Sequence, residues 1–276
     1  MNVLSLFDGM SCGRLALDRA SITPNLYLAS EIDKYAIKVS KDNWDDVKQI
    51  GDVTEVKENT LPSIDLLIGG SPCQSISTLG DGSGLAGKSS LFYEYVRLLR
   101  HTKPKYFILE NVVGSKKAIQ EITEIIGVEP VLFNSNLVSA QNRQRYYWTN
   151  IKFDLPLDKN ILLKDILDVT PSSDANLSEA RLRWLLSDKG QDCLRKRYAV
   201  LDPVKAQCLT ARSDASWNSN YVTRGGVITK LTPQEYEKLQ TVPMDYTSSV
   251  SSSQRYKMLG NGWTVDVIAH ILKHIT

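Results

Sequence analysis

Short apolar runs alternate with helix-like stretches along the first half of the chain. The runs are rich in aliphatic and β-branched residues, which favours strands that are buried in a sheet. Strand-like runs cover residues 3–7, 25–32, 47–50, 64–68, 105–109 and 128–133, and a β-rich element follows over residues 141–148. Helical patterns cover residues 14–20, 34–41, 91–101 and 116–126. This alternation predicts an α/β fold with a doubly wound, mostly parallel sheet.

The rhythm of strands and helices breaks from about residue 151. Residues 174–198 look helical and basic, whereas residues 205–226 are polar and carry clusters of Ser, Asn and Gly. Residues 232–240 read as a helix with a threonine cap and a proline at its first position. An apolar helix is expected over residues 264–275.

Length and charge bound the class of protein. The chain has 276 residues, enough for one domain with a small additional lobe. We expect the main domain over residues 1–150, completed by residues 255–276, and the lobe over residues 151–254. The formal net charge is +2, which neither supports nor excludes a nucleic-acid partner, because local patches matter more than totals.

Cysteine usage and the amino terminus predict the compartment. The four cysteines, Cys12, Cys73, Cys193 and Cys208, form no C-x-x-C pair, and only three histidines accompany them, so no metal site is expected. Residues 1–7 lack the basic and long apolar regions of a signal peptide, and no apolar run reaches the length a bilayer needs. The sequence therefore predicts a cytosolic protein with reduced thiols and no membrane partner.

A cysteine follows the fourth strand-like run on a stiff turn. The run ends in two glycines, and Ser71-Pro72-Cys73 comes next. Pro72 fixes its own φ and lacks an N–H, so the backbone before Cys73 is stiff and cannot extend a strand ladder. Ligands bind at the carboxyl ends of strands in open α/β sheets, so this thiol can be aimed at a substrate. Taken alone, the stretch still favours a small buried hydrophobe, the commoner state of a free cysteine.

Acidic and glycine residues follow the first three strand-like runs. They are Asp8-Gly9 with Gly13, then Glu31, then Asp52. An acid after the second strand suits the hydroxyls of a ribose, and a glycine lets a ligand approach the backbone. The spacing Gly9-x-x-x-Gly13 differs from the dinucleotide fingerprint, so a nucleoside without phosphates fits better, and S-adenosylmethionine is the candidate. Glu31 and Asp52 could instead each be a simple helix cap.

Three further charged residues are candidates for chemistry. Glu110 ends an apolar strand and could serve as a general acid or as a hydrogen-bond partner for a base nitrogen, but for this residue taken singly a solvated strand end is the favoured interpretation. Arg143 and Arg145 lie two residues apart, so on a strand they would share one face and could form forked contacts. A charged, solvent-facing pair is the alternative.

The motifs taken together are more specific than any one of them. In chain order they are Phe7-Asp8-Gly9, Ser30-Glu31, Gly51-Asp52-Val53, Ser71-Pro72-Cys73-Gln74, Glu110-Asn111-Val112, Gln141-x-Arg143-x-Arg145 and Gly260-Asn261-Gly262-Trp263. This ordered set resembles that of the DNA cytosine-5 methyltransferases, and within that family it looks most similar to the catalytic domain of the vertebrate de novo enzymes. The resemblance implies a methyltransferase fold that binds S-adenosylmethionine in the main domain. It also implies a target-recognition region over residues 151–254.

The resemblance implies a reaction and a role for each catalytic residue. The Cys73 thiolate would add to carbon 6 of a flipped cytosine, so that carbon 5 can take the methyl group of S-adenosylmethionine. Glu110 would bind and protonate the ring nitrogen, and Arg145 would hold the base oxygen. Arg143 would orient the Glu110 carboxylate or a loop backbone. The glycine-rich loop over residues 77–88 would close as a lid.

Binding residues also carry over by resemblance. The expected cofactor-binding residues are Phe7, Asp8, Gly9, Met10, Cys12, Glu31, Ile32, Asp52, Val53, Asn261, Gly262 and Trp263. The expected DNA-binding residues are Gln74, Ser77 and Arg212. Arg212 lies in a segment similar to the recognition loop of the de novo enzymes and would read a guanine, or else contact a phosphate. Five basic residues could contact the DNA backbone or form a solvated face: Arg181, Arg183, Arg195, Lys196 and Arg197.

Two departures from the family pattern stand out. Ser11-Cys12 occupies the place where many bacterial members carry a tighter glycine pair. The segment between Trp148 and Thr232 is short for a target-recognition domain, which argues against extensive sequence reading.

Three other functions stay open. Methylation of an exocyclic amino group uses a Pro-Pro-aromatic tetrad, against which Pro72-Cys73 argues. Cytosine-5 methylation of transfer RNA by a related enzyme and a catalytically silent DNA-binding relative are the others. The expected partner is double-stranded DNA, with self-association left open. The expected location is the cytoplasm of a bacterium or phage host, or the nucleus if the source is eukaryotic.

Overall fold

The structure is a computed structural model that describes residues 1–72 and 90–275. The predicted nucleophile Cys73, the predicted DNA-binding residues Gln74 and Ser77, and the predicted lid over residues 77–88 therefore lie outside the described residues.

The chain divides into two compact units. The first, called the sheet unit, comprises Met1–Asn134, Gln144–Leu155 and Val265–Thr276. The second unit comprises Ser135–Arg143 and Pro156–Thr264. The division differs from the expected one, because residues 135–143 and 255–264 belong to the second unit.

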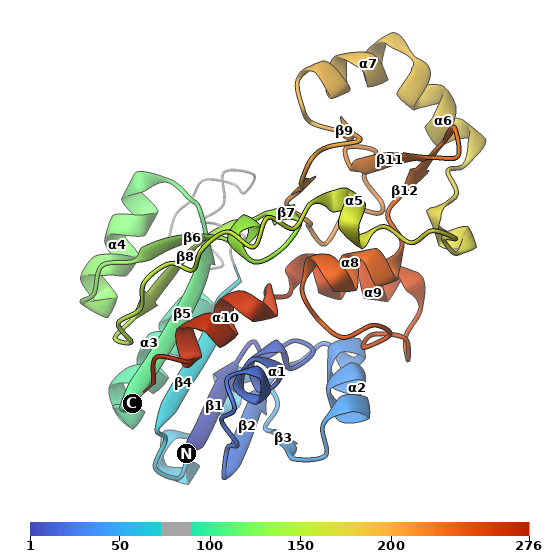
Figure 1. The fold of residues 1–276 in the computed structure, drawn as a ribbon. Helices are drawn as coiled ribbons and strands as arrows, with labels where there is room; N and C mark the ends of the chain where they lie inside the picture. The colour runs from blue at the N-terminus through green and yellow to red at the C-terminus, as the bar shows by residue number, and fades with distance from the viewer. Residues whose placement is uncertain (73–89, 276) are drawn as a thin grey trace. The chain divides into compact units, whose positions relative to one another are not determined.

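The sheet unit is built on a seven-stranded sheet with the order β3-β2-β1-β4-β5-β8-β6 (Figure 1). β1 pairs with β2 and β4, and β4 pairs with β5, all in parallel, whereas β8 runs antiparallel to β5 and β6. The strands are β1 (Asn2–Leu6), β2 (Leu26–Ser30), β3 (Val47–Gln49), β4 (Leu66–Gly70), β5 (Tyr106–Val112), β6 (Val131–Asn134) and β8 (Gln144–Thr149). The predicted α/β class with a mostly parallel sheet is confirmed.

Helices cover both faces of this sheet. The longer ones are α1 (Cys12–Arg19), α2 (Lys34–Asn43), α3 (Ser90–Thr102), α4 (Lys116–Ile126) and α10 (Val265–Leu272), and the short ones are η1 (Val53–Glu55) and η2 (Glu58–Thr60). A Cβ at Gly13 of α1 would lie 2.4 Å from Ile68 Cδ1, and a Cβ at Gly69 would lie 3.1 Å from Tyr95 of α3. Because side chains alternate along β4, α1 and α3 lie on opposite faces.

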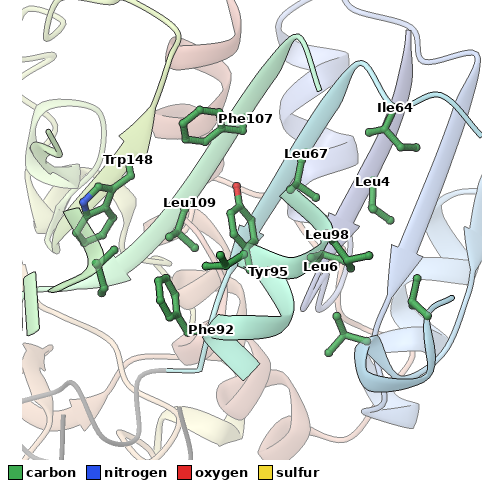
Figure 2. Packing of buried hydrophobic residues seen from close by; sticks show 14 of the residues in the cluster. Leu4, Leu6, Ile64, Leu67, Phe92, Tyr95, Leu98, Phe107, Leu109 and Trp148 are labelled. Carbon is green, nitrogen blue, oxygen red and sulfur yellow. The ribbon is translucent and has the colours of Figure 1, made fainter. Parts of the chain in front are cut away.

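The core on the α3 face includes residues of five strands. Figure 2 shows Phe92, Tyr95 and Leu98 of α3 packed against side chains of the sheet. The strand residues in this cluster include Leu4, Leu6, Leu67, Leu109 and Trp148, all of which are buried. Burying this apolar surface fixes the strand ends in space, and the candidate site is built on those ends.

The second unit combines short strands with short helices. Its strands are β7 (Gln141–Asn142), β9 (Val200–Leu201), β10 (Ala206–Gln207), β11 (Asn220–Arg224) and β12 (Val227–Lys230). Its helices are η4 (Ser135–Leu137), α5 (Leu163–Ile166), η5 (Ser173–Ala175), α6 (Glu179–Leu186), α7 (Asp188–Arg195), α8 (Pro233–Leu239) and α9 (Ser252–Asn261). α8 begins as predicted, since Thr232 and Glu235 form a capping box and Pro233 is the first helical residue.

Two features of this unit differ from the sequence-based prediction. The expected helix over residues 174–198 is broken at Ser187, whose hydroxyl accepts from Gly190 N–H and so caps α7. α9 was not predicted, because its serine-rich start carries little helical signal. Its buried face includes Arg255, which forms an ion pair with Glu237 at 2.9 Å.

Within the described residues, no helix combines the length and the apolar character that crossing a membrane requires.

Candidate active site

The strand order of the sheet reverses between β1 and β4, because β2 and β3 lie on one side of β1 and β4 and β5 lie on the other. From β1 the chain continues outward through β2 to β3, and then returns to add β4 and β5 on the other side. The carboxyl ends of β1 and β4 are neighbours, with Leu6 opposite Gly69. Such a switch point is where open α/β sheets bind ligands. The turns after β1, β2, β4 and β5 therefore form the candidate site of the sheet unit.

The turn after β1 has an unusual backbone. Phe7, Gly9 and Ser11 have φ values of 56°, 62° and 63°, in the left-handed region that L side chains seldom adopt. Glu31 at the end of β2 stabilises this turn, since its Oε2 accepts from Gly9 N–H at 2.8 Å. Its Oε1 accepts from the N–H groups of Ile32 and Asp33, each at 2.8 Å. Three of the roughly four lone-pair positions of this carboxylate are thus used.

The carboxylate of Asp8 stabilises the same turn through hydrogen bonds with buried hydroxyl groups. Asp8 is buried, with 8% of its surface exposed, and accepts from Tyr27 Oη at 2.7 Å and Ser11 Oγ at 2.6 Å. Ser11 Oγ also shares a hydrogen bond of 2.6 Å with Ser40 Oγ of α2. Burial raises the pKa of Asp8 to about 6, although these hydroxyls oppose the rise. A polar network beneath the turn therefore connects β1, β2, α1 and α2.

The other predicted cofactor residues of the sheet unit divide into exposed and buried groups. Ile32 is 73% exposed, so an apolar ligand has side-chain surface to cover beside Glu31. Asp52 caps η1, because its Oδ1 accepts from Thr54 N–H at 2.9 Å and from the Thr54 hydroxyl at 2.8 Å, which lowers its pKa. The helix-cap alternative for Asp52 is therefore what the structure shows. Phe7 packs against the core, and the side chains of Met10, Cys12 and Val53 are buried.

Glu110 and Arg145 form an ion pair on neighbouring strands. In the β5–β8 ladder Glu110 lies opposite Tyr147, and Arg145 lies opposite Val112, so the two charged residues are diagonal neighbours on one face. Arg145 Nε lies 2.8 Å from Glu110 Oε1, and both side chains are mostly buried. Arg145 Nη1 also donates to the carbonyl oxygen of Gln144 at 2.8 Å. The family resemblance implies that Arg145 holds a base oxygen, which stays a prediction; the structure shows an ion pair between Arg145 and Glu110.

Asn111 is a functional residue to which sequence reasoning gave no role. Its Nδ2 donates to Ser71 Oγ at 3.1 Å, and both residues are buried. Its Oδ1 accepts from Val112 N–H at 2.8 Å. Asn111 therefore fixes Ser71, the residue before Pro72, against the end of β5. Its position in the Glu110-Asn111-Val112 motif was the available signal.

Arg143 and Arg145 do not share a strand face. Arg143 lies between β7 and β8 and belongs to the second unit, whereas Arg145 lies in β8 of the sheet unit. Arg143 Nη1 donates to Leu209 O at 2.8 Å, and its Nη2 donates to Gly262 O at 2.9 Å and Gly260 O at 3.3 Å. The prediction of a shared face required both arginines to lie on a strand, whereas Arg143 lies between two strands. Of the two roles proposed for Arg143, these contacts match orientation of a loop backbone.

The motif Asn261-Gly262-Trp263 begins at the last residue of α9 in the second unit. Gly262 O accepts from Arg143 and from Gln240 Nε2, the latter at 3.0 Å. Asn261 is exposed and Trp263 is half-buried. A Cβ at Gly260 would lie 2.2 Å from both the carbonyl carbon and oxygen of Thr210. Glycine is required at this position because the backbone of another segment occupies the space of a side chain.

Replacing Gly260 with alanine is expected to destabilise the protein by about 1–3 kcal/mol, since the new methyl group must displace backbone. Chemical denaturation measures the loss. An exposed position on the same helix provides the control, Ser253→Ala, for which a change within about 0.5 kcal/mol is expected. Equal stabilities of the Gly260→Ala variant and the unsubstituted protein would contradict this reading of the packing.

The structure separates the predicted DNA-contacting arginines. Arg212 is exposed on a turn of the second unit. Arg181, expected at the DNA backbone, is only 7% exposed, and its Nη2 donates to Asp214 O at 2.6 Å. Its other recorded acceptor is Ser216 O. The structure thus contradicts a surface role for Arg181, whereas Arg183 on the same helix is exposed.

Comparison with known proteins identifies the class. A sequence model described as C-5 cytosine-specific DNA methylase matches residues 1–200 and 204–276. The chain belongs to this family, as its motifs predicted, and S-adenosylmethionine is the methyl donor of such enzymes. The finer resemblance to the vertebrate de novo enzymes stays a prediction.

Particular relatives come from phages, bacteria and eukaryotes. The chain is 37% identical over 171 residues to the orphan methyltransferase M.SPRI of Bacillus phage SPR, covering 56% of this chain but only 38% of that protein. It is 26% identical over 320 residues to the type II methyltransferase M.HhaI of Haemophilus parahaemolyticus, covering 100% of this chain and 94% of the relative. A crystallised Spodoptera frugiperda DNMT2 mutant shares the fold at a TM-score of 0.75 and 18% identity, with 99% of this chain and 98% of that chain covered.

Proposed function

We propose that this protein transfers the methyl group of S-adenosylmethionine to carbon 5 of a cytosine in duplex DNA, through an adduct between Cys73 and carbon 6. One observation carries the proposal. The buried carboxylate of Glu110, on β5, is held by Arg145 of β8. β5 pairs with β4, and Pro72 and Cys73 follow β4 in the sequence. A thiol that attacks a pyrimidine needs such a group at the ring nitrogen.

The sheet unit offers a fitting place for the cofactor. A Cβ built at Gly9 meets no atom within 4 Å, so the turn after β1 faces open space. Beside it lie the Glu31 carboxylate, which would accept from ribose hydroxyls, and the exposed Ile32, which would cover the adenine ring. Asp52 would accept from the adenine amino group. When bound there, S-adenosylmethionine supplies an electrophilic methyl group.

The residues of the chain act on the cytosine ring. The sulfur of Cys73 forms a bond to carbon 6, and the ring electrons shift toward carbon 5 as Glu110 delivers a proton to the ring nitrogen. Carbon 5 takes the methyl group, a base removes the remaining proton from carbon 5, and the carbon–sulfur bond breaks. Arg145 holds the Glu110 carboxylate in place during these steps. The target atom is buried in a duplex, so the base must flip out first.

The second unit is the proposed target-recognition region. It carries the exposed Arg212, whose guanidinium has no recorded hydrogen-bond or ion-pair partner among the residues the structure describes. An arginine can form a forked pair of hydrogen bonds with a guanine edge in the major groove. Because relatives include bacterial and phage enzymes, the bacterial cytoplasm is the proposed location.

Covalent trapping on 5-fluorocytosine tests this proposal. Fluorine replaces the proton that must leave carbon 5, so the adduct is expected to accumulate when duplex DNA and S-adenosylmethionine are supplied. The complex should survive denaturing electrophoresis. Peptide mass spectrometry should place the nucleotide on Cys73 and leave Cys12, Cys193 and Cys208 unmodified.

A transfer assay with labelled S-adenosylmethionine completes the test. Duplex DNA is expected to take up the label as 5-methylcytosine, and transfer RNA is not. Labelling of transfer RNA alone would favour the RNA-modifying relative. An active protein that forms no adduct, or an adduct on another cysteine, would refute the proposed chemistry.

A further inference from the structure

Residues 209–217 of the second unit form the segment that carries Arg212, here called the reader loop. Arg212 is exposed, whereas Leu209 and Ser213 on either side of it are buried, with exposed fractions of 0% and 6%. The loop thus presents Arg212 at the surface, together with the exposed Thr210, Ala215 and Trp217.

The start of the reader loop is fixed by the residues around the Asn261-Gly262-Trp263 motif. Arg143 bridges Leu209 O, at 2.8 Å, to Gly262 O, at 2.9 Å. The close approach of Gly260 to Thr210 leaves no space for a side chain between α9 and the loop. The first two residues of the loop therefore cannot shift without moving the end of α9.

The end of the reader loop is fixed by Arg181 of α6. One nitrogen of its guanidinium, Nη2, donates to the carbonyl oxygens of Asp214 and Ser216. The guanidinium carbon lies 6.0 Å from the ring centre of Tyr221, whose hydroxyl donates to Trp217 O at 2.6 Å. The buried guanidinium of Arg181 thus binds the carbonyl groups of Asp214 and Ser216 near the end of the loop.

Bonds within the loop complete its shape. Thr210 N–H donates to Ser213 Oγ at 2.8 Å, and Ser213 N–H returns a bond to Thr210 O at 3.0 Å. Ser216 N–H donates to the carbonyl oxygen of Arg212 at 2.7 Å. The Asp214 carboxylate forms an ion pair with Lys230 of β12. The backbone on both sides of Arg212 is therefore held, while its side chain is left at the surface.

We infer that Arg181 is a positioning residue for sequence selection: it holds the reader loop in the one conformation that aims Arg212 at the base beside the target cytosine. Arg181 does not touch DNA in this role. The inference rests on the proposed function, and deepens it by assigning a residue that the sequence had placed at the DNA backbone.

The burial of Arg181 supports a geometric role. Taking a guanidinium out of water is costly unless its donors are used. Here Nε is buried without a hydrogen-bond partner among the described residues, so the cost is only partly offset, and the two acceptors of Nη2 are loop carbonyls. A loop that is ordered before binding loses less conformational entropy on contact with DNA. Fixed geometry is also what a forked arginine–guanine contact requires.

Methylation profiling of the Arg181→Gln variant tests the inference. The unsubstituted protein and the variant methylate a duplex library with random bases around a cytosine, and bisulfite sequencing gives the preference at each flanking position. The variant is expected to lose about tenfold or more of the preference at the base read by Arg212. The salt dependence of DNA binding is expected to stay unchanged, because no phosphate contact is removed.

Lys189→Gln is the matched control, since it removes one positive charge from an exposed position of α7, the helix that follows α6. Its sequence preference should equal that of the unsubstituted protein. Arg212→Ala should show the same loss of preference as Arg181→Gln. The inference is overturned if Arg181→Gln keeps the original preference, or if its only effect is a salt slope lowered by about one, the sign of a lost phosphate contact.

Arg181→Lys carries the test if Arg181→Gln does not fold, as judged by circular dichroism and thermal melting. Lysine keeps the charge, but its shorter side chain cannot bridge both carbonyls, so preference should fall with an unchanged salt slope. An original preference in this variant also overturns the inference. Failure of the proposed function is distinguishable, because the unsubstituted protein would then methylate no cytosine at all.

Discussion

Replacement of Glu110 by glutamine is expected to slow methyl transfer about 10²–10⁴-fold, the range that a positioned general acid contributes. Glutamine keeps the shape and can still donate a hydrogen bond to the ring nitrogen, but it has no proton to deliver. The ion pair with Arg145 at 2.8 Å is lost as well. Because the lost interaction belongs to the transition state, single-turnover kinetics should show a lower kcat with little change in DNA affinity.

Glu129→Gln is the control for this substitution, because Glu129 is exposed and distant from the site in sequence. It should retain the full rate. A double-mutant cycle with Arg145→Met then measures how far the pair acts as a unit. The combined variant should be scarcely slower than Glu110→Gln, a coupling of about 0.5–3 kcal/mol. If the Glu110→Gln variant transfers the methyl group less than tenfold more slowly than the unsubstituted protein, Glu110 is not the general acid.

Asp8→Asn is expected to change how stability depends on pH by up to about 3 kcal/mol. The pKa of Asp8 is raised by burial to about 6 from its ordinary value of 3.8, and two pKa units correspond to about 3 kcal/mol. The folded state then binds more protons than the unfolded state between about pH 4 and 6. The stability that Asp8 contributes is therefore present below about pH 4 and is lost as the pH rises through about 6.

Denaturation of both proteins at pH 4.5 and pH 7.5 measures this dependence. The unsubstituted protein should lose stability relative to Asp8→Asn on going to the higher pH. Glu31 adds to the raised pKa of Asp8, whereas the hydroxyls of Ser11, Ser5 and Tyr27 oppose it. Asp18→Asn, at an exposed position of α1, should show no such dependence. Parallel pH profiles for the Asp8→Asn variant and the unsubstituted protein would contradict the prediction.

Local pattern was sufficient for most of the sheet unit. The predicted helix over residues 116–126 matches α4, and Asp33 caps α2 as expected. β5 is longer than predicted, extending to Val112, because its ladders with β4 and β8 continue through Glu110. Pairing partners are contributed by distant residues, so a local apolar run could not indicate where that strand ends.

Prediction was weaker where charged side chains contact distant groups. Arg143 and Arg181 are basic residues in polar stretches, and sequence alone could not tell a surface charge from a buried one. Both donate to backbone carbonyl oxygens. Because every residue type has a backbone carbonyl, the sequence does not indicate which residues will accept these hydrogen bonds. The same holds for Glu31, whose recorded acceptor positions are occupied by backbone N–H groups.

The sequence by itself determined the family, the fold class and the chemical groups at the strand ends, because motif order and apolar periodicity are properties of the chain. Only the tertiary structure decided which partner each charged group has. In the structure Arg145 forms an ion pair with Glu110. Arg143 donates to the carbonyl oxygens of Gly262 and Leu209, and Arg181 donates to carbonyl oxygens of the reader loop. Such choices depend on which segments the core brings within hydrogen-bond distance, and that distance is set by packing rather than by spacing along the chain.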